Sequence, residues 1–136
     1  MPRAARSTRT LGGLKSAVQI FTNVALSFAQ DLVDENFEHA FQLLSPALQS
    51  QFSPPGLRQM LWRVFESYAP DDRPLRAVLD RKQMTSTNTD WPDKQPNDLG
   101  WVYVSILGAE FVEAVTVTVA HIDGRPLIRD IEWGRP

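Results

Sequence analysis

Glu113 and His121 form the candidate acid–base pair on the expected inner face of a sheet in the second half of the chain. In an apolar pocket, desolvation would raise the pKa of a carboxylic acid toward neutrality and lower that of an imidazole, so that each group would be held closer to its neutral form. The two residues lie on one expected strand, and their separation in sequence places them about 26 Å apart. They therefore cannot act as a pair, and His121 also lies beside a turn that solvent reaches. We assign no catalytic residue.

Four other side chains form the candidate ligand-binding set, namely Trp101, Tyr103, Arg129 and Trp133. We expect them on the inner face of a sheet, where the aromatic rings would either line a pocket for a flat apolar ligand or fill the core. A guanidinium on such a face needs a carboxylate, a carbonyl group, a bound anion or a route to solvent. Asp80 or an acid on the first helix is the expected partner of Arg129, and anion binding is the alternative.

The composition argues against several other classes of site. The 136 residues include no cysteine and two histidines, which excludes disulfides and thiolate chemistry and argues against a histidine-rich metal site. Fourteen basic and sixteen acidic residues give a net charge of −2, a poor basis for binding nucleic acid. Gly12-Gly13 belongs to no phosphate-binding pattern, so we expect no cofactor. No run reaches the roughly 18 apolar residues that span a bilayer, so we expect no membrane partner.

The charge is unevenly distributed along the chain. Residues 1–20 contain four basic residues, Arg3, Arg6, Arg9 and Lys15, and no acid. The other 116 residues contain ten basic and sixteen acidic residues and carry a net charge of −6. A basic start also fits a secretory leader, but polar residues interrupt the apolar stretch that follows. We expect a basic flexible leader over residues 1–13, a single domain over residues 14–136 and, by default, a cytoplasmic location.

Apolar residues at alternating spacings of three and four predict a long first helix. The stripe consists of Leu11, Leu14, Val18, Phe21, Ala25, Phe28 and Leu32. A short second helix is expected around residues 37–44. Ser45-Pro46 and Ser53-Pro54 each resemble a helix start, with serine as the cap and proline in the first turn. Three to four helices thus form the first half of the chain.

The second half of the chain predicts an antiparallel sheet. Alternating or β-branched runs place strands at residues 75–85, 101–107, 111–122 and 127–133. Residues 85–100 are rich in Thr, Asn, Asp and Pro and predict a long exposed loop. Trp91 within this loop either folds back over the domain or meets a partner.

Asp123-Gly124 supplies the turn between the last two strands, and the length of that turn decides which residues share a face. A two-residue turn would place Asp130 and Glu132 opposite valines. A three-residue loop with a glycine bulge gives the pairs His121–Leu127, Val117–Ile131 and Val115–Trp133 on one face, and Thr118–Asp130 and Thr116–Glu132 on the other. We favour the bulged loop because it separates apolar from polar side chains.

One expected strand is apolar on both of its faces. Trp101 and Tyr103 lie on one face, and Val102, Val104 and Ile106 lie on the other. Because helices can cover only one face of the sheet, the second face meets another copy of the chain or lies under the long loop. We hypothesise a homodimer formed through the outer sheet face.

The segment from Asn36 to Leu48 reads NFEHAFQLLSPAL, in which an aromatic–acidic step is followed by a Leu-Leu-Ser-Pro turn. It resembles the helix junction of small uncharacterised bacterial domains in the nuclear transport factor 2-like (cystatin-like cone) superfamily. The closing hairpin from Gly124 to Trp133 is similar to the end of such domains, and the likeness covers residues 14–134. It implies an α+β fold in which a strongly bent antiparallel sheet of about four strands wraps around a long first helix, with a pocket between them.

That superfamily contains isomerases, dehydratases and cyclases as well as non-catalytic binding domains, so the fold alone does not choose a function. No catalytic motif of its enzymes matches this chain residue by residue. We expect a small non-catalytic binding domain whose apolar pocket holds a small hydrophobic molecule. One alternative is a cofactor-independent acid–base enzyme acting on such a molecule. The other is a protein inhibitor or immunity-type domain that engages a basic partner through its acidic surface and the Trp91 loop.

Overall fold

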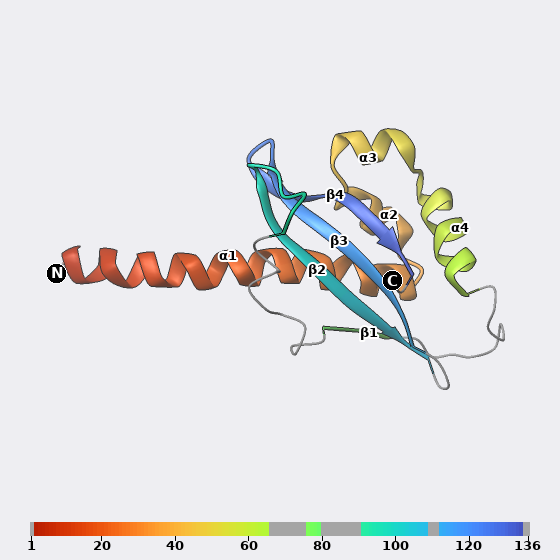
Figure 1. Ribbon diagram of the computed structural model, residues 1–136, viewed down its shortest axis with the longest axis horizontal. Coiled ribbons are helices and arrows are strands. Elements are labelled where there is room, and N and C mark those ends of the chain that lie inside the picture. Colours follow the sequence, from red (N-terminus) through yellow and green to blue (C-terminus); the bar gives the residue numbers. More distant parts are fainter. Residues whose placement is uncertain (1, 66–75, 80–90, 109–111, 135–136) are drawn as a thin grey trace.

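The computed structural model describes residues 2–65, 76–79, 91–108 and 112–134, with side chains from Val18 onward except that of Leu79. Within these ranges helices come first and strands second (Figure 1). The helices are α1 (Pro2–Val33), α2 (Phe37–Gln42), α3 (Pro46–Gln51) and α4 (Pro54–Phe65). The strands β1 (Arg76–Leu79), β2 (Asp98–Leu107), β3 (Val112–Ile122) and β4 (Arg125–Trp133) form one open antiparallel sheet in that order. The predicted α+β class is confirmed.

Several bounds differ from those expected. α1 includes residues 2–13, and the division into a leader at 1–13 and a domain at 14–136 stays a prediction. Asp98, Leu99 and Gly100, expected at the end of the long loop, belong to β2. The second part of the first predicted strand, residues 80–85, lies outside the described residues.

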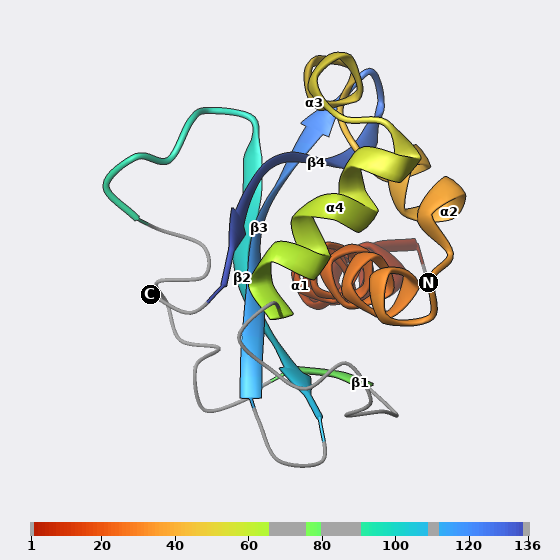
Figure 2. The same ribbon diagram turned by 90° about the vertical axis from the view of Figure 1, so that its right-hand side faces the viewer.

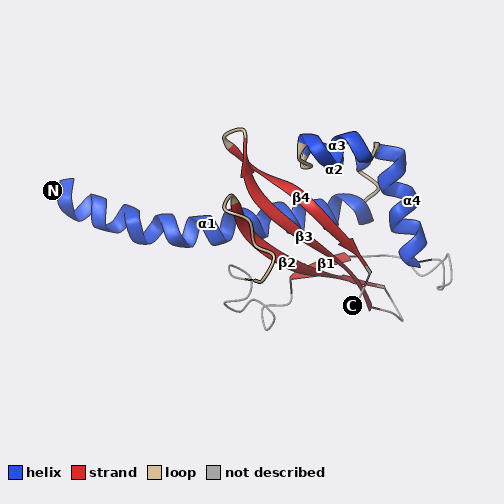
Figure 3. Cartoon of the chain, turned by 45° about the horizontal axis from the view of Figure 1, so that its top comes forward, coloured by secondary structure: helices blue, strands red, loops and turns tan. Residues whose placement is uncertain are grey.

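The helices cover one face of the sheet, and the main core lies between the two layers (Figure 2). Its fully buried members include Phe21, Ala25, Phe28, Leu32, Leu44, Leu57, Val102, Val104, Ile106, Val115, Val117, Val119 and Ile128. The predicted apolar stripe of the first helix is confirmed from Phe21 onward. Val18 is an exception and is 41% exposed. The N-terminal part of α1 continues past the sheet (Figure 3).

Both serine–proline helix starts are confirmed. The Ser45 hydroxyl accepts the backbone N–H of Leu48 at 3.3 Å, and the Ser53 hydroxyl accepts that of Gly56 at 3.1 Å. The proline after each serine is the first residue of its helix. The Ser45 N–H in turn donates to the Ile128 carbonyl at 2.7 Å, which ties the start of α3 to β4.

The face of β2 that packs against the helices is the opposite of the predicted one. The residues that face the helices, each at most 1% exposed, are Val102, Val104 and Ile106. Trp101 pairs with Thr118 and Tyr103 with Thr116, on the outer face of the sheet. The prediction that both aromatic side chains point inward is therefore wrong. α1 passes so close to β2 at Gly100 that branched aliphatic side chains, rather than large rings, occupy the inner face of this strand.

The β3–β4 hairpin closes with a two-residue turn. Ile122 pairs with Arg125, which leaves Asp123 and Gly124 between them. Both of these residues have positive φ angles, 52° and 82°, as a type I′ turn requires. The predicted three-residue bulged loop is therefore wrong. The Asp-Gly dipeptide suits this turn, because glycine has no Cβ and the short polar side chain of aspartate tolerates the left-handed region.

A β-bulge within β4 restores the predicted register. The pairing shifts after Thr118 and leaves Arg129 as the extra residue. Beyond the bulge, the predicted pairs Val117–Ile131, Val115–Trp133, Thr118–Asp130 and Thr116–Glu132 are all confirmed. Nearer the turn, His121 pairs with Pro126 and not with the predicted Leu127. The extra residue that brings Ile131 and Trp133 opposite the core valines thus lies in the strand instead of in the turn.

Gly124→Ala is expected to lower the free energy of unfolding by about 1 kcal/mol, because alanine disfavours a positive φ. An added Cβ would have nothing within 4 Å, so the cost is conformational and not steric. Urea denaturation measures it, with Asp123→Asn as a control that should leave the stability unchanged. An unaltered stability of Gly124→Ala would contradict the type I′ turn.

Gly100→Ala is expected to destabilise the protein by overpacking. The new Cβ would stand 2.4, 2.5 and 2.6 Å from three ring atoms of Phe21, a side chain that is 2% exposed. We expect the free energy of unfolding to fall by about 1–3 kcal/mol, measured by urea denaturation. In a Phe21→Leu background the same change should cost less. Equal costs in the two backgrounds would show that the Phe21 ring is not the obstacle.

Candidate functional site

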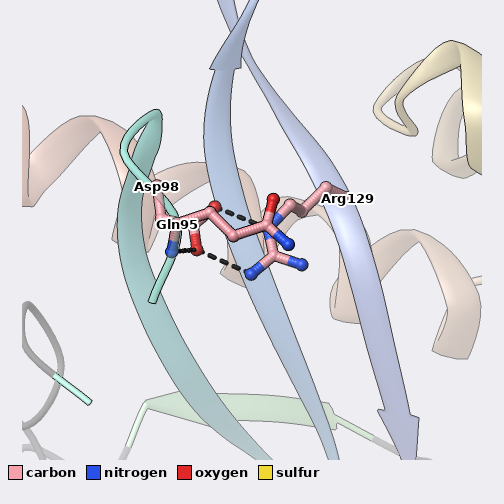
Figure 4. A network of polar contacts seen from close by, with 3 residues as sticks. All are labelled: Gln95, Asp98 and Arg129. Carbon is pink, nitrogen blue, oxygen red and sulfur yellow. Dashed lines mark hydrogen bonds and ion pairs between the residues drawn. The ribbon is translucent and has the colours of Figure 1, made fainter. Parts of the chain in front are cut away.

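The four residues predicted to bind a ligand do not share one face of the sheet. Trp133 lies on the helix-facing side, with its ring centroid 6.5 Å from that of Phe28 on α1. Trp101 and Tyr103 lie on the outer face. Arg129 occupies the bulge of β4 and reaches toward β2 (Figure 4). These four residues therefore cannot together line one pocket between the sheet and the helices.

Arg129 is held by Asp98, the first residue of β2 (Figure 4). The Nε atom of Arg129 donates to Asp98 Oδ1 at 2.5 Å and its Nη2 atom to Oδ2 at 2.6 Å, in a two-pronged ion pair. The strand between them is β3, where the small Ala120 pairs with Asp98 and leaves room for the contact. The Asp98 side chain has no exposed surface, and that of Arg129 is 22% exposed. Arg129 thus has a protein partner, but not the expected Asp80 or an acid of the first helix.

The surroundings of this pair keep both of its members charged. Burial acts to raise the pKa of the Asp98 carboxyl, but hydrogen bonds from Arg129 and from the Gln95 backbone, with the positive charges of Arg129 and Lys94, lower this pKa below its usual range. The hydrogen bond to Asp98 raises the pKa of Arg129. Because the carboxylate already engages the guanidinium on two nitrogens, the geometry favours a structural role over anion binding.

The same carboxylate organises the segment that precedes β2. Asp98 Oδ2 accepts the backbone N–H of Gln95 at 2.8 Å, and the Asp98 N–H donates to the Gln95 carbonyl at 3.0 Å. Within this segment the Lys94 ammonium lies 5.8 Å from the ring centroid of Trp91, which is half-buried. Figure 2 shows the segment on the side of the sheet away from the helices. The ion pair therefore also fixes one end of the Trp91 segment.

The side chains suited to acid–base chemistry are not brought together. Glu113 and His121 lie near opposite ends of β3, and His121 is exposed beside the turn. The other histidine, His39, is also exposed, and its Nδ1 atom lies 2.5 Å from Asp31 Oδ2, a contact between α2 and α1. The prediction that Glu113 and His121 cannot form a pair is confirmed.

The indole N–H of Trp133 is buried and has no hydrogen-bond acceptor, alone among the side-chain polar atoms of the described ranges. The residues directly across the sheet from it are apolar, because Trp133 pairs with Val115 and Val115 pairs with Val104. Phe28 of α1 adds a further apolar contact. A buried donor without an acceptor costs about 1–3 kcal/mol, so its persistence calls for an explanation.

Residues 18–65, 91–108 and 112–134 contain no group of three or more histidine and acidic side chains placed to hold a metal ion. Among the helices of the described chain, none is both long and apolar enough to cross a bilayer. No family model, curated protein or solved structure matches the chain.

Proposed function

We propose that this chain is a non-catalytic binding domain that takes a small, largely apolar molecule between its sheet and its helices, beside Trp133. The observation that carries this function is the buried indole N–H of Trp133, which has no acceptor. Sites for small molecules are mostly apolar and contain a few polar groups that fix the orientation of the ligand. Trp133 supplies one such group among apolar neighbours.

The chemistry around Trp133 defines the expected ligand. Phe28, Val104 and Val115 offer apolar contacts and no side-chain hydrogen bond. A charged group would lose its hydration there without compensation. The ligand is therefore an apolar frame with one acceptor, such as a carbonyl or ether oxygen, which receives the Trp133 N–H.

We further propose that the domain is a nuclear transport factor 2-like cone. The likeness of residues 36–48 and of the hairpin from Gly124 to Trp133 supports this assignment, as does the antiparallel sheet packed against α1. The resemblance implies a ligand site between the sheet and the first helix. Trp133 lies on that side of the sheet.

The enzymatic alternative has less support from the geometry. Asp98 and Arg129 neutralise each other, and Glu113 and His121 are separated along β3. A general acid or base must reach the proton that it transfers. Glu113 lies on the same face as Val115 and approaches Gly134, but His121 is too far along β3 to act with it.

The Trp133 N–H can be observed directly in solution. The chain contains four tryptophans, so a nitrogen-15-labelled sample gives four indole cross-peaks, and Trp133→Phe identifies the one that belongs to Trp133. We expect titration with cyclohexanone, a small apolar carbonyl compound, to move this cross-peak downfield. The shift should saturate with a Kd on the order of 1 mM, about −0.6 kcal/mol for each non-hydrogen atom of the probe.

Methylenecyclohexane, which keeps the ring but lacks the oxygen acceptor, is the matched control and should leave the N–H shift nearly unchanged. Trp101→Phe on the outer face should retain cyclohexanone binding. A Trp133 cross-peak that stays in place during the cyclohexanone titration, or that moves equally with both compounds, would contradict the proposed function.

A further inference from the structure

We propose that two copies of this chain exchange their N-terminal segments, so that residues 2–20 of one copy lie on the outer sheet face of the other. This homodimer is independent of the Trp133 site, which lies on the other side of the sheet. The position of α1, the chemistry of the outer face and the distribution of charge along the chain each support it.

The first part of α1 extends beyond the sheet of its own chain. Among the described side chains of α1, the buried ones begin at Phe21, whereas Val18 and Ile20 are 41% and 44% exposed. Figures 1 and 3 show the helix continuing beyond the sheet. Because α1 packs on the inner side as a continuous helix, its first part cannot reach the outer face of the same sheet. A helical segment in water depends on packing, and the adjacent Gly12 and Gly13 weaken this one further.

The outer face of the sheet carries aromatic, hydroxyl and acidic side chains. We define the outer patch as Tyr103, Thr116, Thr118, Asp130 and Glu132, which share one face by register. Asp130 and Glu132 are exposed, and Tyr103 is partly exposed. The threonines between them are only 3% and 5% exposed, so the accessible part of the outer patch consists of the aromatic and acidic side chains around them. The outer patch therefore fits a segment that carries both apolar and basic side chains.

Charge complementarity selects a second copy as the occupant. Residues 1–20 contain four basic residues and no acid, and they also contain Leu11, Leu14 and Val18, whereas the remainder of the chain has a net charge of −6. Opposite charges across an interface favour encounter and set the register of the partners. An exchange between two copies is reciprocal, so each contact forms twice and the assembly closes as a dimer.

Analytical ultracentrifugation of the full chain tests this dimer. We expect a monomer–dimer equilibrium that weakens as the salt concentration rises. Asp130→Lys combined with Glu132→Lys should raise the dimer Kd by about tenfold or more, and Arg6→Glu combined with Arg9→Glu should do the same. All four changes in one chain exchange the charges at these four positions, while Arg3 and Lys15 stay basic, and should return the Kd toward that of the wild type.

Asp34→Lys combined with Glu38→Lys is the matched control, because these acids are exposed on the helical side of the molecule. This control should leave the Kd unchanged, and circular dichroism should show the same fold in every variant. A mass of one chain at every concentration would overturn the proposed exchange. So would a dimer that survives the reversals in the outer patch, or a combined variant that does not recover.

Discussion

Phe28→Ala is expected to lower the free energy of unfolding by about 3–5 kcal/mol. Phe28 is fully buried on α1, and its ring packs against that of Trp133 at a centroid distance of 6.5 Å. Removing the ring deletes apolar contacts and leaves a cavity between α1 and the sheet. Neither layer can move far enough to close it, because both are held by other buried residues. Urea denaturation at equilibrium measures the loss.

Phe37→Ala is the matched control for this substitution, since Phe37 is only partly buried on α2. The free energy of unfolding should fall clearly less for Phe37→Ala than for Phe28→Ala. A loss below about 1 kcal/mol for Phe28→Ala would mean that this side chain does not lie in the main core, because surface substitutions have effects of that size.

Asp98→Asn is expected to cost about 3 kcal/mol at neutral pH, measured by urea denaturation. The substitution keeps the size of the side chain but removes the charge that engages Arg129 on two nitrogens. This value is at the low end for a broken buried ion pair, because the Arg129 side chain is 22% exposed and keeps a route to water. The backbone N–H of Gln95 would also lose a charged acceptor.

The cost of Asp98→Asn should depend on pH in a defined direction. The pKa of Asp98 is lower in the folded chain than in the unfolded chain, so ionisation stabilises the wild type fully above the unfolded pKa of about 3.9. This stabilisation is lost as the pH falls through the pKa that Asp98 has in the folded chain. The difference between wild type and variant should therefore shrink below about pH 4. Asp93→Asn, an exposed acid of the same segment, should show no such difference, and a constant gap for Asp98→Asn would contradict the ion pair.

The helical half of the molecule could be predicted closely because its signals are local. The spacing of Phe21, Phe28 and Leu32 marks the buried side of α1 without reference to the rest of the chain. The caps Ser45 and Ser53 act on amides three residues away. Only where α1 leaves the sheet, at Val18, does the pattern fail, because burial there depends on the length of the neighbouring layer.

The sheet could be predicted only where apolar and polar side chains alternate cleanly. The alternation predicts the pairs Val117–Ile131 and Val115–Trp133. It does not tell where the extra residue lies, because an insertion in the turn and an insertion in the strand give the same pairs. β2 is apolar on both faces, so the side that meets the helices depends on the close approach of Phe21 to Gly100. That contact joins distant parts of the chain and has no local signal.

The candidate site could be predicted only in part. The pairing with Val115 predicts that Trp133 lies on the inner face, and the structure confirms this position. Asp98 was missed because its neighbours in sequence are typical of a loop, whereas the strand begins at this residue. A buried acid at the first position of a strand is recognisable only once its partner, Arg129, is known to lie two strands away.

The ion pair across β3 has a kinetic consequence. Asp98 and Arg129 are 31 positions apart and lie on strands that are not neighbours, so they meet only after β3 has been inserted between β2 and β4. We expect an interaction between such non-neighbouring strands to be absent from the folding transition state and to act mainly on the unfolding rate. In stopped-flow measurements, Asp98→Asn should therefore accelerate unfolding and leave the folding rate nearly unchanged. The pair determines how long the assembled sheet persists rather than how fast it assembles.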